Sequence, residues 1–204
     1  MPKTTVRAVI DFHFDGKNLA AQAAAQQHGL VRMAGIAKET KKALRLAIVR
    51  AINEGIPPYE AARAIANIVG LASSDAQAVM NYRESLINAG TGVDRADLLA
   101  ARLSRRKLKG RAVAIARTET MLALNKGAVI SWRQAQKKGL IGRLAKKEWI
   151  VTPDDRLCPI CAPLDGAQTE INRTFDGGLE PPAHTLCRCT VGIIPGPIGL
   201  RAEA

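Results

Sequence analysis

All four cysteines of the chain lie in one segment near its C-terminal end. Cys158 and Cys161 belong to a Cys-Pro-Ile-Cys turn, and Cys187 and Cys189 follow His184 closely. Thiolate and imidazole groups are the ligands of structural zinc, and two cysteines at this spacing can direct both sulfurs at one ion about 2.3 Å away. The sequence therefore predicts a zinc site whose candidate ligands are Cys158, Cys161, His184, Cys187 and Cys189.

A structural zinc ion takes four ligands, so one of the five candidates is spare. Cys158 and Cys161 form the expected first pair, and His184, Cys187 and Cys189 compete for the other two places. Cys187 and Cys189 would point to opposite faces of a straight strand, so joint ligation requires a turn between them. Without that turn, His184 and one of the two cysteines complete a Cys3His set. This excess of ligands favours a closed, structural site over a catalytic one with an open position.

Other uses of the cysteines are disfavoured. No apolar segment typical of a signal peptide follows Met1, and no run of roughly 18 apolar residues occurs, so an intracellular protein without a membrane span is expected. Disulfides are uncommon in that setting. A redox Cys-x-x-Cys would be expected beside a βαβ pattern, which is missing here. A nuclease with cysteine knuckles would need catalytic groups beyond His184.

The residues before this segment predict mostly helices, because the chain is rich in aliphatic side chains and only 3% aromatic. Helices are predicted over 19–53, 59–70, 74–88, 94–103 and 112–138, and glycine or proline marks most of the breaks. Ser74 and Gln77 predict a capping box at the start of the third helix. Strands are predicted over 6–14 and 146–152 from their β-branched and aromatic residues.

The cysteine segment contains two turn signals, Leu164-Asp165-Gly166 and Phe175-Asp176-Gly177-Gly178. The expected fold is therefore mainly α: a helical N-terminal region followed by a small zinc-stapled, β-hairpin-like C-terminal module, which makes the chain α+β. A module of roughly 40 residues buries little core. Zinc binding, worth about 10–16 kcal/mol in small zinc domains, is expected to supply most of its folding free energy.

Most of the net charge of +12 falls in residues 91–150, which hold 15 basic and 4 acidic side chains. Such a concentration favours a polyanionic partner, either nucleic acid or an acidic protein surface, although a solvated helix face gives the same pattern. The predicted nucleic-acid or partner-binding residues are Arg102, Arg105, Arg106, Lys107, Lys109 and Arg111.

The helices on either side of Gly70 have the spacing of a helix-turn-helix. In that interpretation residues 75–84 form a recognition helix that offers Gln77, Asn81 and Arg83 to base edges. An alanine-rich helical hairpin gives the same pattern by packing alone. A sequence-specific DNA-binding regulator is therefore one alternative function. A metal-dependent hydrolase is a weaker one, because it needs an open zinc and a general base.

Several short motifs follow one another in a specific order over residues 110–190. They are Ala116-Arg117-Thr118-Glu119-Thr120, Asn125, Trp132, then Trp149, Thr152, Asp154-Asp155-Arg156, Cys158, Cys161 and Leu164-Asp165-Gly166, and finally Pro181-Pro182-Ala183-His184 with Cys187-Arg188-Cys189. This order resembles the phage head morphogenesis family, the minor head proteins similar to protein F of phage Mu. Thr185 stands where many relatives have proline.

The resemblance implies a non-enzymatic virion component with structural zinc. Such a protein is a low-copy minor capsid protein, made in the host cytoplasm and bound at the portal vertex inside the capsid. Its expected partners are the portal protein, the major capsid or scaffolding protein, and packaged double-stranded DNA contacted without sequence preference. The implied domains are a helical region with an N-terminal arm over 1–110, a head-morphogenesis domain over 111–190, and a tail over 191–204.

Overall fold

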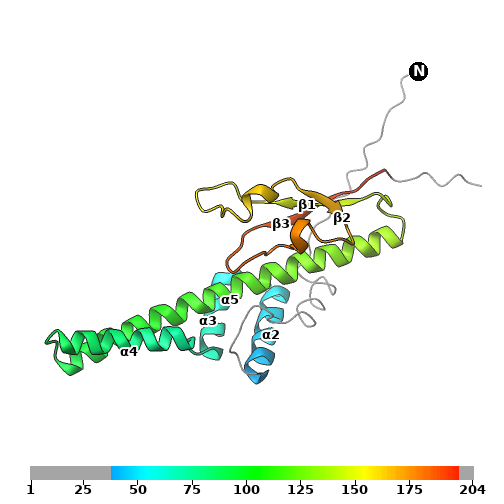
Figure 1. The fold of residues 1–204 in the computed structure, drawn as a ribbon. Coiled ribbons are helices and arrows are strands. Elements are labelled where there is room, and N and C mark those ends of the chain that lie inside the picture. The colour runs from blue at the N-terminus through cyan, green and yellow to red at the C-terminus, as the bar shows by residue number, and fades with distance from the viewer. Residues whose placement is uncertain (1–37, 198–204) are drawn as a thin grey trace, which may run out of the picture.

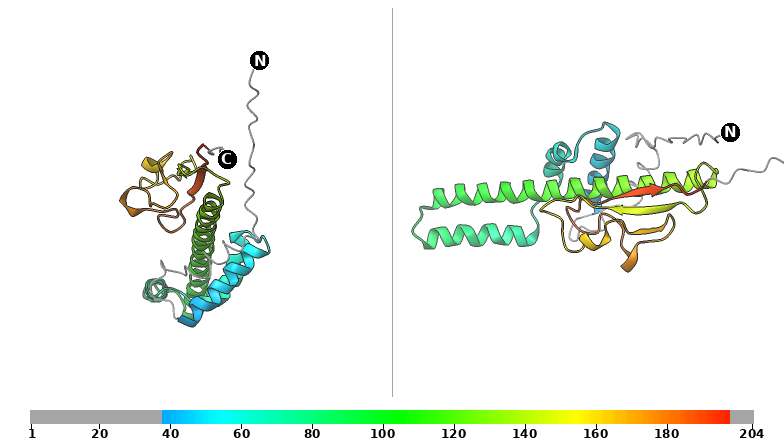
Figure 2. Two further views of the ribbon diagram at one scale, coloured as in Figure 1. Left: turned by 90° about the vertical axis from the view of Figure 1, so that its right-hand side faces the viewer. Right: turned by 90° about the horizontal axis from the view of Figure 1, so that it is seen from above.

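A computed structural model describes residues 38–197, and one long helix is its axis. Helix α5 (Val93–Lys137) has 45 residues, which corresponds to a length of about 67 Å. The shorter helices are α2 (Lys38–Asn53), α3 (Pro58–Ile68) and α4 (Ser73–Asn88). Figures 1 and 2 show α4 beside the N-terminal half of α5, α2 and α3 near its middle, and a small sheet along its C-terminal half.

Helix α5 replaces the two helices expected over 94–103 and 112–138. The basic run between them continues the helix through Gly110. A glycine inside a helix costs about 1 kcal/mol relative to alanine. Packing of Ala112 and Ile115 against α2 and α3 offsets this cost, because both side chains are buried in the same cluster as Leu44 and Ile65. Residues 110 and 111, where a domain boundary was predicted, therefore both lie within α5, and the division itself stays a prediction.

Glycines end α4 and α5 as expected. Gly90 and Gly139 have φ angles of 84° and 72°, a region that L side chains rarely adopt. Their N–H groups bond to carbonyls three residues back, at 2.9 Å for Gly90 and 3.1 Å for Gly139, and the next N–H in each case bonds five residues back. This is the Schellman arrangement. The predicted capping box is wrong: α4 begins at Ser73 after the N-cap Ala72, without a side-chain cap.

Two separate clusters of buried residues stabilise the fold. The helical core joins α2, α3 and α5 and is built from Leu44, Ile48, Ile52, Ala62, Ile65, Val69, Ala112, Ile115, Ala116 and Ala123. The module core joins the C-terminal half of α5 to the sheet and includes Val129, Trp132, Ile141, Trp149, Cys161, Ile171, Phe175, Cys187 and Cys189. The two clusters share no residue. We therefore expect that disruption of one core leaves the other folded.

The helix-turn-helix interpretation is not supported by the packing of α3 and α4. Both helices pack mainly on α5 rather than on each other. Gln77 donates to Asn81 at 2.8 Å, and Arg83 is paired with Asp97 on α5. The three side chains expected to contact bases are therefore engaged within the helical hairpin.

The C-terminal module is a three-stranded antiparallel sheet rather than a simple hairpin. Strand β1 (Lys146–Ile150) is central, with β2 (Gln168–Glu170) on one side and β3 (Thr190–Ile194) on the other. Trp149 pairs with Val191 across β1 and β3, and its ring meets that of Phe175 edge-on, with centroids 5.1 Å apart. The expected class, mainly α with a small β module, is confirmed.

The strand predicted over 6–14 and the first half of the helix predicted over 19–53 lie outside the described residues. Among residues 38–197, no helix is long and apolar enough to cross a membrane.

Candidate metal centre

The Cys-Pro-Ile-Cys turn places two sulfurs together at the start of the 3-10 helix η1 (Ala162–Leu164). The Cys158 carbonyl accepts from the Cys161 N–H at 3.1 Å and from the Ala162 N–H at 3.0 Å, which closes the turn. The Cys161 N–H also lies 3.3 Å from the Cys158 sulfur. Backbone donors aimed at a sulfur stabilise the thiolate that a metal requires. The first predicted ligand pair is therefore formed locally.

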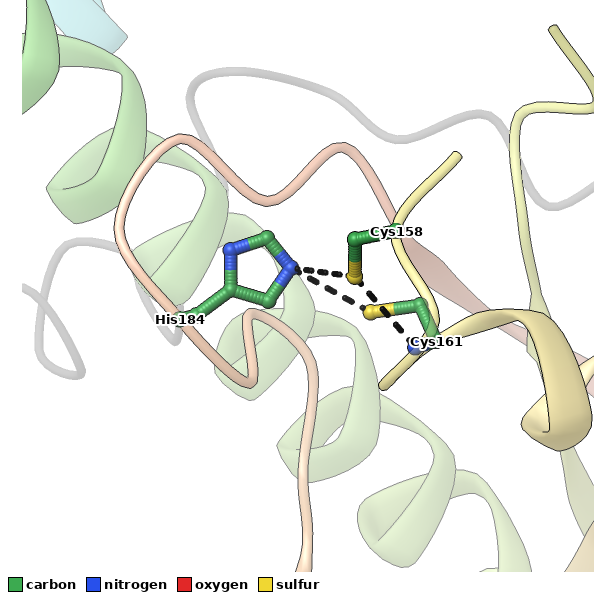
Figure 3. A group of neighbouring side chains, drawn as sticks. All are labelled: Cys158, Cys161 and His184. Atoms are coloured by element: carbon green, nitrogen blue, oxygen red, sulfur yellow. Dashed lines mark hydrogen bonds between the residues drawn. The ribbon is translucent and has the colours of Figure 1, made fainter. Parts of the chain in front are cut away.

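His184 reaches this pair from the loop before β3 (Figure 3). Its Nε2 lies 3.0 Å from the Cys158 sulfur and 3.4 Å from the Cys161 sulfur. Its Nδ1 lies 2.9 Å from the Thr185 carbonyl. A carbonyl only accepts hydrogen bonds, so Nδ1 carries the proton and Nε2 presents its lone pair to the sulfurs. This is how a second group fixes the tautomer of a metal-binding histidine.

Cys187 and Cys189 lie on the other side of Cys161. The Cys161 and Cys187 sulfurs are 3.7 Å apart, and the sulfurs of Cys161, Cys187 and Cys189 lie within 4.8 Å of one another. A tetrahedral zinc site places two sulfurs about 3.8 Å apart and a sulfur and nitrogen about 3.6 Å apart. The five predicted ligands therefore meet in two overlapping groups that share Cys161, at separations that suit a metal such as zinc.

The pKa values of the thiols differ within this cluster. Burial opposes ionisation of Cys158, but the N–H groups of Cys161 and Ile160, the Cys161 thiol and the charge of His184 together outweigh it and lower the Cys158 pKa below its ordinary value. Burial opposes ionisation of Cys187 as well, and N–H donation from Cys189 helps to lower its pKa. Burial raises the pKa of Cys161 and of Cys189. Those two thiols need a bound cation to ionise at neutral pH.

The donor set fits a structural metal better than a catalytic one. The cavity at the cluster is only about 30 Å³, and Cys158, Cys161, His184, Cys187 and Cys189 are among its lining residues. That volume matches one water molecule or ion and leaves no room for a substrate. The buried indole N–H of Trp149 has no hydrogen-bond acceptor among the described residues, and its proximity to Cys189 partly offsets the effect of burial on the pKa of that thiol.

Helix α5 holds the loop that carries His184 and the last two cysteines. The Asn125 side chain is buried, and its Nδ2 donates to the Pro181 carbonyl at 3.1 Å and the Cys189 carbonyl at 3.3 Å. Its Oδ1 accepts from the Thr190 hydroxyl at 2.7 Å and from the Val191 N–H at 3.4 Å. About two turns earlier on α5, the Thr118 hydroxyl accepts from the Leu186 N–H at 3.0 Å. These groups position the loop that carries three of the five candidate ligands.

A further ion pair closes the module beside the site. The Arg188 guanidinium binds both carboxylate oxygens of Asp154, which holds the pKa of that carboxyl well below its usual range. This pair joins the chain between Cys187 and Cys189 to the segment before Cys158. Sequence reasoning quoted Asp154, Arg188 and Asn125 among the motifs without giving them a role. The Thr185 carbonyl was missed because a backbone group leaves no signal in the sequence.

The chain matches one family of known proteins. A family model described as phage Mu protein F-like protein matches residues 87–192, just over half of the chain. The chain belongs to the phage Mu protein F-like family. The matched region runs from the end of α4 to β3 and includes all five candidate ligands, Asn125 and Thr118. No curated protein and no solved structure matched the chain.

Family membership confirms the resemblance found in the sequence. Mu F-like proteins are phage head morphogenesis proteins and structural components of the head. The Cys/His cluster of this Mu F-like chain is the part of the module whose chemistry suits a metal.

The six predicted basic residues of the Mu F-like chain lie on two faces of α5. Arg102, Arg105, Arg106 and Lys109 line a groove between α4 and α5. Lys107 pairs with Asp75 at 2.7 Å instead, and Lys107 and Arg111 line a second hollow that extends to Thr185. The basic run therefore forms two surfaces rather than one.

Loss of the Asn125 side chain should loosen the loop that holds the metal ligands. Asn125→Ala removes four hydrogen bonds and leaves two carbonyls without that donor and the Val191 N–H without that acceptor. We therefore expect a loss of about 2–4 kcal/mol in the free energy of unfolding of the module. Thr118→Val removes one bond and should cost about 1 kcal/mol. Urea unfolding followed by tryptophan fluorescence measures both, and an equal or smaller loss for Asn125→Ala would contradict this role.

Proposed function

We propose that this chain is a phage minor head protein that acts in head morphogenesis at the portal vertex, on the inside of the capsid. Its partners in this proposal are the portal protein, the major capsid or scaffolding protein, and packaged double-stranded DNA. The observation that carries the proposal is the match to the Mu F-like family over the region that contains the metal centre and its supports on α5.

The metal has a structural part in this function. We propose that Cys158, Cys161, His184 and Cys187 bind zinc, because the Cys161–Cys187 separation of 3.7 Å already suits a shared ion. Bound zinc would join the Cys158 turn to the loop before β3 and so fix the sheet against α5. The basic surfaces on α5 support contact with an acidic protein or with DNA phosphates.

Particle composition tests the proposal. Proheads purified from cells that produce the phage should contain the chain at low copy number relative to the major capsid protein, as measured by quantitative mass spectrometry. Chemical cross-linking of these particles should join the chain to the portal protein. A soluble phage protein with no role in the head serves as the control for carry-over. Absence of the chain from both proheads and filled heads would contradict the proposal.

A further inference from the structure

The groove between α4 and α5 concentrates positive charge on one helix face. It has a volume of about 550 Å³ and is lined by Tyr82, Leu99, Arg102, Arg105, Arg106 and Lys109. The four basic residues follow the spacing i, i+3, i+4 and i+7, which places them on the same side of α5. The geometry of the helix therefore gathers these four positive charges along one side of the groove.

The charge of this groove is not neutralised within the described part of the chain. No carboxylate of residues 38–197 forms an ion pair with Arg102, Arg105 or Arg106. Other cations of the same hairpin do have such partners, since Arg83 pairs with Asp97 and Lys107 pairs with Asp75. A row of unpaired cations beside paired ones indicates a surface suited to an anionic partner.

Within residues 38–197, no second layer covers the hairpin of α4 and α5. Helix α4 has no buried residue along its 16 positions, and Tyr82, which lines the groove, is 36% exposed. A helix that is hydrophobic on one stripe becomes stable when that stripe is covered by another element. A third helix in the groove would cover Tyr82 and Leu99 and lie beside the arginines.

The distribution of charge favours a protein helix over duplex DNA. The positive row spans only seven residue steps, a length of about 10 Å. Beyond it, towards the tip of the hairpin, Glu84, Asp94 and Asp97 offset the remaining basic residues. A duplex lying along the hairpin would meet these carboxylates, and phosphates alone would leave the apolar side chains of the groove uncovered.

We propose that this groove binds an acidic amphipathic helix of a partner protein. The carboxylates of that helix pair with Arg102, Arg105 and Arg106, and its apolar side chains cover Tyr82 and Leu99. The inference rests on the proposed function only in taking the partner to be another head component. Binding itself is a property of the purified chain.

Fluorescence anisotropy with the full zinc-loaded chain tests the groove. The probe is a synthetic helical peptide with leucines on one face flanked by glutamates, compared with a peptide of the same composition in scrambled order. We expect the amphipathic peptide to bind at least about tenfold more tightly. Arg102→Gln combined with Arg106→Gln should weaken it about tenfold, because two partly exposed ion pairs are lost. Arg143→Gln with Lys146→Gln, an equal charge change at exposed sites near the sheet, should leave it unchanged.

A second variant separates peptide from DNA. Tyr82→Ala should weaken peptide binding several-fold and leave the binding of a short duplex DNA unchanged, and circular dichroism checks that each variant is folded. Equal binding of the scrambled peptide, or no binding of either peptide, overturns the inference. Tighter binding of the duplex through Arg102 and Arg106 also overturns it and assigns the groove to phosphates. These results come from purified protein, whereas the proposed function fails only if the chain is absent from particles.

Discussion

Removal of zinc should unfold the C-terminal module and leave the helical core folded. The module core surrounds Cys161, Cys187 and Cys189, whereas the helical core around Leu44 and Ile65 shares no residue with it. Zinc binding supplies about 10–16 kcal/mol in small zinc domains. The module has three short strands and too little buried surface to replace a contribution of that size.

Tryptophan fluorescence gives a direct measurement of this result. The chain has two tryptophans, and both Trp132 and Trp149 belong to the module core. A strong chelator should shift their emission to longer wavelength while far-ultraviolet circular dichroism keeps most of the helical signal, and added zinc should restore the emission. Unchanged fluorescence after verified metal loss would contradict the structural role. Loss of all helicity in the same step would contradict the independence of the two cores.

Single substitutions identify the ligands. Cys161→Ser should abolish stoichiometric zinc, because Cys161 is shared by both groups of candidate ligands. Cys187→Ser should do the same if Cys187 is the fourth ligand, and Cys189→Ser should keep the full metal load. Metal analysis of each purified variant by mass spectrometry decides between them. The reverse result for the last two variants would assign Cys189, and a full load in Cys161→Ser would contradict the metal centre.

The closeness of the first two candidate ligands was predictable because they are separated by only two residues. Cys158 and Cys161 are brought together by one turn, which the spacing alone indicates. The way that His184 and Cys187 join them was not predictable, since it depends on β3 pairing with β1 from 40 residues further along the chain. That pairing is set by the burial of Trp149 and by the hold of Asn125 on the loop, and neither is visible as a local pattern.

For the helices, the sequence predicted where two of them end but not how they are joined or packed. Local signals placed the ends of α4 and α5 correctly at Gly90 and Gly139, but suggested a break near Gly110 that packing overrides. The division of the basic run could have been foreseen, because neighbouring residues on a helix point about 100° apart. Arg106 and Lys107 therefore cannot share a face. The sequence predicted the helix α4 but not its position beside α5, and that position turns one of these faces into a groove.

Glu180→Ala should destabilise the module strongly, because it leaves a buried cation without its partner. The Lys147 side chain on β1 is 1% exposed and pairs with Glu180, whose side chain is 36% exposed. The ammonium also lies 5.0 Å from the centre of the Phe175 ring. Removing one partner of a buried ion pair costs about 3–5 kcal/mol. Because Glu180 is partly in water, we expect about 3 kcal/mol in the free energy of unfolding, measured with urea in the presence of zinc.

Lys147→Met is the matched variant. It decides whether the loss of stability in Glu180→Ala comes from the unpaired charge of Lys147 or from lost packing. Methionine has a similar volume and no charge to desolvate, so this change should cost less than Glu180→Ala and could even stabilise the module. Combined with Glu180→Ala, it should recover most of the stability lost in that single variant. If the double variant is instead as unstable as the sum of both changes, the ion pair is not coupled and Glu180 stabilises the module through other contacts. Recovery would show that the module requires a matched ion pair beside Phe175 and not the Glu180 side chain itself.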